Sequence, residues 1–207
     1  MHLKRQAVTM KLPIPRKGTT YIARASSNID NSVSVLSAVR DMLKLARTLR
    51  EVKYLIHSKL LKLNGRHVRD YRESIKLFNI LEADKPYMLT ILQTGRFSLQ
   101  EVKDREKRPC KVINKKILNG DKIQINLHDG TNISSKDKIY IGDTVYLNKE
   151  GKVVDHIKFE KGKNVFVISG KYQGLKGKID SIDKSKVSVS ILGKNSITLS
   201  KRQVIAL

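Results

Sequence analysis

Lysine and arginine residues at helical spacing are the part of this sequence with the most obvious chemistry. They form two consecutive sets: Arg40, Lys44 and Arg47 at i, i+4 and i+7, and Arg50, Lys53 and His57 at i, i+3 and i+7. Residues at these spacings share one face of a helix, so each set would line up cationic groups. Such a row can contact consecutive phosphates of a nucleic acid, whereas the alternative is a pair of solvated helix faces. The scarcity of interleaved acidic residues favours the phosphate contact.

The first 29 residues are also basic and contain no acid. Pro13 and Pro15 prevent one continuous helix across this segment and favour extended backbone. Because a mitochondrial presequence would need that helix, we expect residues 1–32 to form a basic extended arm that follows RNA phosphates instead. The candidate contacts of this arm are Lys4, Arg5, Lys11, Arg16, Lys17 and Arg24.

A turn signal identifies a third basic group. Asn64 and Gly65 stand between strand-like flanks, and a type I′ hairpin turn favours this pair because both central residues take positive φ. The predicted hairpin carries Lys62, Arg66 and Arg69. We expect it to extend the basic platform of the two helices that precede it.

Segment 165–179 contains three glycines, at positions 170, 174 and 177. Alternating apolar residues on both sides predict a strand, a tight loop and a second strand. The glycines would let the loop turn sharply and approach a partner, while Lys171, Tyr172 and Lys176 offer RNA two charges and a stacking ring. The structural alternative is that the glycines serve only the turn and that Tyr172 packs in the barrel.

The composition excludes several classes of function. The 207 residues include 42 Lys and Arg against 19 Asp and Glu, and the net charge of +23 indicates a polyanionic partner rather than a small-molecule substrate. Cys110 is the single cysteine, so a disulfide scaffold cannot form and a reducing compartment is expected. An anionic membrane surface is a distant second to nucleic acid as the partner of this charge, and no membrane partner is expected. No apolar run reaches the roughly 18 to 20 residues of a membrane span, so we expect a soluble protein.

Signatures of catalysis are missing as well. The five histidines are scattered and lack metal-ligand spacing. His128 precedes Asp129 and Gly130, where a locally hydrogen-bonded turn explains the residues better than acid–base chemistry because no nucleophile accompanies them. P-loops, dinucleotide fingerprints and nucleophile elbows do not occur. We therefore expect no catalytic residue, no cofactor and no metal site.

Apolar periodicity predicts the elements that position these residues. It indicates two helices between residues 33 and about 59, and the second should start at Thr48 because Thr48 and Glu51 have capping-box spacing. Beyond Pro86, short strands at 122–127, 143–147 and 153–159 predict a small β-barrel or sandwich. The mixed-charge stretch 101–108 is interpreted as a linker or a solvated helix. Residues from about 161 onward are expected to form a separate five-stranded barrel.

Several of these segments resemble known families. Residues 40–69, with TLREVK at 48–53 and LNGR at 63–66, resemble the RNA-binding domain named after ribosomal protein S-four. The glycine pattern of residues 165–179 is similar to a KOW motif, a strand–loop–strand unit. Three further segments resemble the e-type small-subunit ribosomal protein four (S-four-e) family of archaea and eukaryotes: HLKR at 2–5, PIPRKG at 13–18 and NLHDG at 126–130. The combination, in this order, covers nearly the whole chain.

The resemblance implies an α+β multidomain protein without enzymatic activity. The expected parts are a basic arm (1–32), an S-four-like RNA-binding domain (33–90), a linker and central β-barrel (91–160) and an SH3-like KOW barrel (161–207). It also implies a structural role in the small ribosomal subunit, in the cytoplasm, with rRNA and neighbouring ribosomal proteins as partners. The chain lacks the C-terminal extension of eukaryotic members, so an archaeal member is expected.

Two positions depart from the S-four pattern. Lys44 stands where such domains usually have Gly, so the first helix is expected to end later or to bend differently. Leu49 replaces an Arg that many relatives carry at the start of the second helix.

Two rival functions have S-four-type or KOW units too. An RNA-modifying enzyme would need a catalytic domain, and the roughly 120 residues after Pro86 already divide into two small β units. A free transcription or translation factor would be distinguished by washing off ribosomes in high salt.

Overall fold

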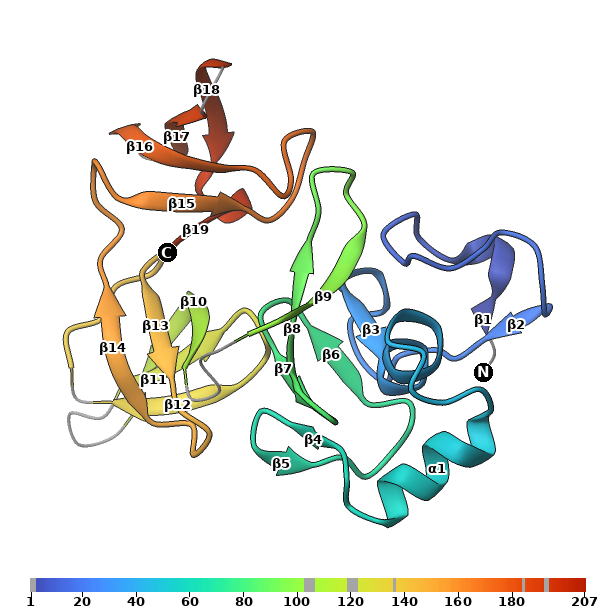
Figure 1. Ribbon diagram of the computed structural model, residues 1–207. Coiled ribbons are helices and arrows are strands. Elements are labelled where there is room, and N and C mark those ends of the chain that lie inside the picture. Colours follow the sequence, from blue (N-terminus) through green and yellow to red (C-terminus); the bar gives the residue numbers. More distant parts are fainter. Residues whose placement is uncertain (1–2, 103–106, 119–122, 136, 184, 192–193) are drawn as a thin grey trace. The chain divides into compact units, whose positions relative to one another are not determined.

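The computed structural model describes residues 3–102, 107–118, 123–135, 137–183, 185–191 and 194–207. Over these residues the protein is mostly β-sheet with few helices (Figure 1). The chain divides into two compact units, residues 1–105 (unit 1) and 106–207 (unit 2). Each unit contains its own sheets.

The N-terminal segment of unit 1 folds back on itself, so the expectation of an extended arm is wrong. Strand β1 (Leu3–Lys4) pairs antiparallel with β2 (Tyr21–Ile22), and the 3-10 helix η1 (Arg5–Ala7) follows β1. The Arg5 guanidinium holds the intervening loop, because it donates to the carbonyls of Pro15 and Thr19, the latter at 2.7 Å. The amide of Phe97 donates to the carbonyl of Lys11 at 2.7 Å and ties the loop to the rest of unit 1.

The first predicted helix is present, but it begins two residues later than expected and is mostly π-helical. After the 3-10 helix η2 (Ile29–Asn31), strand β3 (Ser32–Ser34) pairs with β6 (Ser74–Lys76), and this pairing places Val33 opposite Ile75. Val35 and Leu36 are α-helical and lead into the π-helix η3 (Ser37–Met42), which ends before Lys44, a residue with a φ of +58°. Lys44 therefore adopts the left-handed conformation that favours Gly.

Helix α1 (Leu49–His57) and the hairpin after it follow the sequence prediction. The Thr48 hydroxyl accepts a hydrogen bond from the amide of Glu51, which confirms the predicted start of the helix. Asn64 and Gly65 have φ of +52° and +84°, and they form the turn that connects strand β4 to strand β5. The five-stranded sheet of unit 1 has the order β5-β4-β7-β8-β9. Its strands are β4 (Lys62–Leu63), β5 (Arg66–His67), β7 (Ile80–Glu82), β8 (Pro86–Ile91) and β9 (Phe97–Glu101).

The first sheet of unit 2 contains the strands predicted after Pro86. Its order is β12-β11-β10-β13-β14, and all its pairings are antiparallel. The core of this sheet includes Cys110, Val112, Ile125 and Val145. Its strands are β10 (Arg108–Ile117), β11 (Ile123–Leu127), β12 (Asn132–Ser135), β13 (Thr144–Leu147) and β14 (Val153–Ile157). Part of the charged stretch at 101–108 lies outside the described residues.

The second sheet of unit 2 has the order β18-β17-β16-β15-β19, in which β19, the last strand along the chain, lies beside β15, the first. The 3-10 helix η4 (Lys201–Gln203) connects β18 to β19. Valines and isoleucines alternate along these strands, and their inward-facing side chains form one buried cluster. The strands are β15 (Asn164–Val167), β16 (Lys176–Ile182), β17 (Lys186–Ile191), β18 (Lys194–Ser200) and β19 (Val204–Ala206).

Candidate nucleic-acid interface

The second basic set lies on the solvent side of α1. The helix buries Val52 and Ile56, and the predicted cationic residues occupy its opposite side. This surface, called here the α1 pole, also includes a tyrosine, and all four of its residues are exposed: Arg50, Lys53, Tyr54 and His57. The described helix therefore presents three potential cations and one aromatic ring side by side.

Glu51 is the one acidic residue of α1, and its carboxylate is occupied at the N-terminus of the helix. It accepts hydrogen bonds from the Arg47 amide at 2.8 Å and from the Thr48 hydroxyl at 2.9 Å. These bonds, the one from Arg47 foremost, lower the pKa of Glu51 and keep it ionised. Because the carboxylate is held by backbone and hydroxyl donors, it is not directed at the cations of the α1 pole.

The first basic set does not share one helix face, so that prediction is wrong. Arg40 lies on η3, Lys44 follows it in the left-handed conformation, and Arg47 precedes α1. The Arg40 guanidinium also forms a two-pronged ion pair with Asp41, at 2.8 and 3.0 Å. Lys44 and Arg47 are exposed.

The hairpin brings one engaged and one exposed arginine close together in sequence. Arg66 forms an ion pair with Glu73, whose other carboxylate oxygen accepts from the amide of Arg69 at 3.3 Å. The Arg69 side chain is exposed, whereas Lys62 on β4 is half-buried. Among the predicted hairpin contacts, Arg69 is the one most available to a partner.

The cations of the N-terminal segment divide in the same way. Lys4, Arg16 and Lys17 are exposed. Arg5 is committed to backbone carbonyls, and the Lys11 ammonium donates to the side-chain oxygen of Asn31. Arg24 is half-buried.

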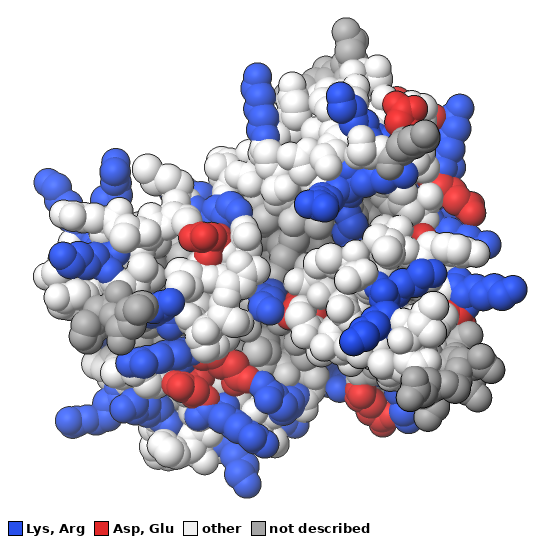
Figure 2. All heavy atoms as spheres, turned by 180° about the vertical axis from the view of Figure 1, so that it is seen from behind, with Lys and Arg blue, Asp and Glu red and all other residues white. Residues whose placement is uncertain are grey.

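On the face shown in Figure 2, Lys and Arg side chains are more frequent than Asp and Glu side chains, which are scattered. Blue side chains project from many places on this face rather than from one spot. An excess of exposed positive charge of this kind attracts a polyanion.

The glycine loop of unit 2 combines structural and exposed residues. Gly174 has a φ of +82°, which meets the expectation of a positive φ at that position. Gly177 instead has no room for a side chain, because a Cβ there would lie 2.5 Å from the backbone oxygen of Ser190. Tyr172 packs against the core cluster of this sheet, as the structural alternative proposed, and the Lys171 ammonium lies 5.9 Å from the centre of its ring.

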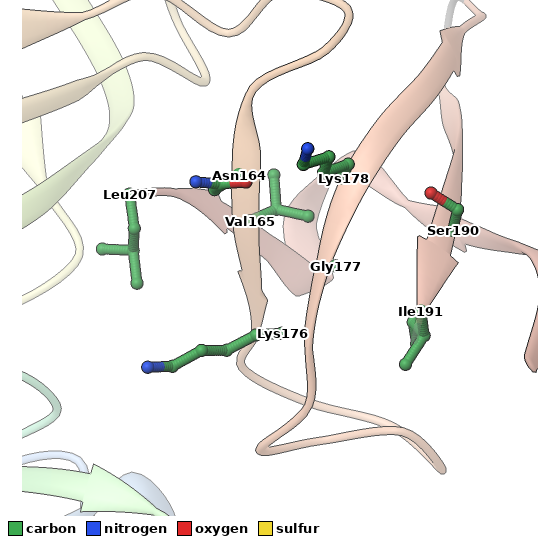
Figure 3. Close-up of a pocket in the computed structure, with 8 residues that line it drawn as sticks. All are labelled: Asn164, Val165, Lys176, Gly177, Lys178, Ser190, Ile191 and Leu207. Carbon is green, nitrogen blue, oxygen red and sulfur yellow. The ribbon is translucent and has the colours of Figure 1, made fainter. Parts of the chain in front are cut away.

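A groove beside this loop adds a lysine that the sequence analysis missed. Lys176 and Lys178 project from β16 on either side of Gly177 (Figure 3). Both are exposed, and the period-2 geometry of a strand directs them to the same face. The alternation K-G-K could have identified Lys178. The groove is lined by Asn164, Val165, Lys176, Gly177, Lys178, Ser190, Ile191 and Leu207.

Unit 2 also contains polar groups that are buried for structural reasons. The side chains of Arg108 and Asp129 are 7% and 3% exposed and form an ion pair. Burial raises the pKa of Asp129, but the Arg108 guanidinium and hydrogen bonds from Thr131 outweigh it and hold that pKa below its usual value. The ring Nδ1 of His128 accepts from the amide of Lys111 at 3.1 Å, so His128 bonds within its own sheet.

Lys111 joins the two sheets of unit 2. It lies on β10, is 6% exposed, and its ammonium donates to the carbonyls of Lys201 and Val204. Burial lowers the pKa of Lys111 to about 8. No pattern in the sequence distinguished this lysine from the exposed ones.

Nothing among the described side chains is arranged as a metal centre, because no three of their His, Cys, Asp and Glu residues cluster. The described helices are also too short or too polar to cross a membrane. Burial raises the pKa of the Cys110 thiol to about 12, so this cysteine stays protonated at neutral pH.

Comparison with known proteins gives consistent matches. The model of ribosomal family S4e matches residues 83–154, and that of the KOW motif matches residues 161–191. Small ribosomal subunit protein eS4 of Methanococcus vannielii is 32% identical over 199 residues, covering 88% of this chain and 82% of the relative. The protein of the same name from Archaeoglobus fulgidus is 33% identical over 187 residues, covering 87% and 80%.

A solved structure agrees with these matches. The crystal structure of the 30S ribosomal protein S4e from Thermoplasma acidophilum superposes with a TM-score of 0.74 at 25% sequence identity, covering 86% of this chain and 95% of that one. The relatives are archaeal, as expected, and ribosomal proteins of this family are structural components rather than enzymes. With matches of this identity over most of both chains, the protein belongs to the S4e family of ribosomal proteins.

Proposed function

We propose that this chain is a structural constituent of the small ribosomal subunit, in the cytoplasm, and that it binds rRNA through phosphate contacts. Its partners would be small-subunit rRNA and neighbouring ribosomal proteins. The observation that carries the proposal is the α1 pole, where Arg50, Lys53 and His57 are exposed and the only acid of the helix is occupied elsewhere. Basic side chains in a row on one face of a helix suit a polyanionic backbone.

The candidate contacts fall into two classes. The side chains of the first class are exposed and are proposed as the main phosphate contacts: Lys4, Arg16, Lys17, Lys44, Arg47, Arg50, Lys53, Arg69, Lys171 and Lys176. Those of the second class already have acceptors within unit 1 and are proposed to contribute less: Arg5, Lys11, Arg40 and Arg66. Arg24, Lys62 and Tyr172 are half-buried and are proposed as peripheral contacts.

The mechanism proposed is positioning rather than chemistry. Each lysine or arginine that meets a phosphate releases condensed counterions, and the gain in entropy favours the complex. Contacts of this type fix register and orientation but carry no base sequence. Recognition of folded rRNA would then depend on the shape in which the basic surfaces are displayed.

The finer architecture is part of the proposal. We infer an S-four-like RNA-binding domain at 33–90 after the N-terminal segment 1–32, a linker and central β-barrel at 91–160, and an SH3-like KOW barrel at 161–207. The strand order of the last sheet supports the barrel, because β19 returns beside β15 after the short helix η4. A closed barrel would protect the sheet edges of such a small domain.

The experiment compares two pairs of charge-matched variants in binding to small-subunit rRNA at several salt concentrations. Arg50→Gln with Lys53→Gln removes two exposed cations, and Arg40→Gln with Arg66→Gln removes two that have acidic partners. Each lost phosphate contact should reduce the slope of log K against log salt by about 0.7 to 0.9. The first pair should therefore lower the slope clearly, and the second should lower it less.

Two outcomes would contradict the proposal. An unchanged slope in the first pair would mean that the α1 pole is a solvated helix face. A wild-type protein that leaves small subunits in a high-salt wash would instead be a free factor, because an integral constituent should stay bound.

A further inference from the structure

Tyr54 is an aromatic residue that the phosphate mechanism does not use. Its side chain is 70% exposed at the α1 pole. Arg50 precedes it by four residues and His57 follows it by three, so the three side chains lie within an arc of about 60° on the helix. Val52 and Ile56 bury the opposite side.

The surroundings of the ring are cationic rather than apolar. Lys53 flanks it, and the Lys53 ammonium lies 5.5 Å from the centre of the Tyr71 ring. This cation–π contact favours a position of the Lys53 ammonium near the Tyr71 ring. A protein partner that buried Tyr54 as apolar surface would also have to bury these charges, which is costly without acidic partners.

An unpaired nucleotide matches this arrangement. Every base has a flat face that stacks on an aromatic ring, and phosphates lie on both sides of it along the strand. Bases within a duplex are already stacked, so a protein ring reaches bases in loops, bulges and ends. The flat ring, with the Arg50 guanidinium on one side and the His57 imidazole on the other, therefore corresponds to one base and the phosphates next to it.

We propose that Tyr54 stacks on an unpaired base of the bound RNA, with Arg50 and His57 contacting the phosphates on either side. This inference rests on the proposed function, because it takes RNA as the ligand of the α1 pole. It adds a preference for single-stranded nucleotides at that site, which phosphate contacts alone do not provide.

The test uses the full chain and two RNA probes of equal length: a hairpin with a single-stranded tail that contains 2-aminopurine, and a fully paired hairpin. Tyr54→Phe keeps the ring, Tyr54→Leu keeps apolar surface without the ring, and Tyr54→Ala removes both. Because Ala favours helices more than Tyr does and the side chain is exposed, the variants should fold. Leu60→Ala is the matched control, because Leu60 follows α1 and is 57% exposed.

Stacking predicts a specific pattern. The Ala and Leu variants should bind the tailed probe about 5- to 150-fold more weakly than the wild type, which is the range that stacking contributes per base. The Phe variant and Leu60→Ala should bind it normally, and only proteins with a ring at position 54 should quench the 2-aminopurine. All variants should bind the paired hairpin alike.

Two results would overturn the inference without touching the proposed function: Tyr54→Ala binding the tailed probe as tightly as the wild type, or Tyr54→Leu doing so. The second would identify an apolar contact. If the wild type bound neither probe, the inference would fail with RNA binding itself. That failure is distinguishable because it does not depend on residue 54.

Discussion

Replacing Lys111 with Met tests how unit 2 holds its two sheets together. The Lys111 ammonium donates to the carbonyls of Lys201 and Val204, and Met keeps most of the apolar chain while offering no donor. A buried polar group left without a partner costs about 1 to 3 kcal/mol. Two such carbonyls predict a loss of about 2 to 6 kcal/mol in the free energy of unfolding, less the free energy regained by removing a buried charge.

The free energy regained by removing the buried charge of Lys111 depends on pH. Burial lowers the pKa of Lys111 to about 8 from the ordinary 10.5, and the difference corresponds to about 3 kcal/mol. Between these two values the unfolded chain holds the proton and the folded chain releases it, so stability rises with pH. The neutral amine still has two N–H groups, which is enough for both carbonyls.

Urea unfolding at pH 7 and pH 10 measures the free energy of unfolding of the wild type and of Lys111→Met. The gap is the wild-type value minus the Lys111→Met value. Because all other groups titrate in both proteins, the change of this gap with pH reports on Lys111 alone. The gap should be smaller at pH 7 and widen by up to about 3 kcal/mol at pH 10. Lys116→Met, at an exposed position of the same strand, should stay within about 0.5 kcal/mol of the wild type at both pH values. A gap that stayed constant, or narrowed, would refute the reasoning.

Other residues of unit 2 give shorter tests. The Cys110 thiol should react with a thiol reagent only as fast as the protein unfolds, because it is buried with its pKa raised to about 12. Asp129, whose pKa is lowered in the fold, should contribute stability that is lost in acid melts as the pH falls below about 4. Gly174→Val should lower the melting temperature through about 1 to 3 kcal/mol of strain at positive φ. Lys171→Ala with Lys176→Ala should melt normally but reduce retention on salt-washed small subunits, and the reverse result would make these lysines structural.

Local signals in the sequence were enough for part of the fold. The start of α1 was predictable because Thr48 and Glu51 make their hydrogen bonds within one turn of helix. The hairpin was predictable because Asn64 and Gly65 alone determine its turn. In both cases the residues that carry the signal are also the residues that form the structure.

The wrong predictions of local structure concern residues whose partners are distant in sequence. Val33 fits a helical period, yet it lies in β3 because it pairs with Ile75, more than forty residues away. The N-terminal segment was expected to be extended, but the Arg5 guanidinium donates to the carbonyls of Pro15 and Thr19 and closes a loop. Such pairings depend on tertiary structure, which overrides local propensity. The exposed face of α1 was therefore predictable, because the helix cap and the spacing of the buried Val52 and Ile56 are local features.

The net charge of the chain overstates the number of phosphates it can contact. Arg5, Arg40, Arg66, Arg108 and Lys111 all have acceptors inside their own unit, so binding RNA through them would first break those bonds. Every cation contributes to the long-range field that steers an approaching polyanion, whether or not it is paired. Only those that meet a phosphate release counterions and appear in the salt dependence of the equilibrium. The association rate should therefore respond to the full charge of +23, while the salt slope of the affinity should report the smaller set of exposed cations that includes the α1 pole.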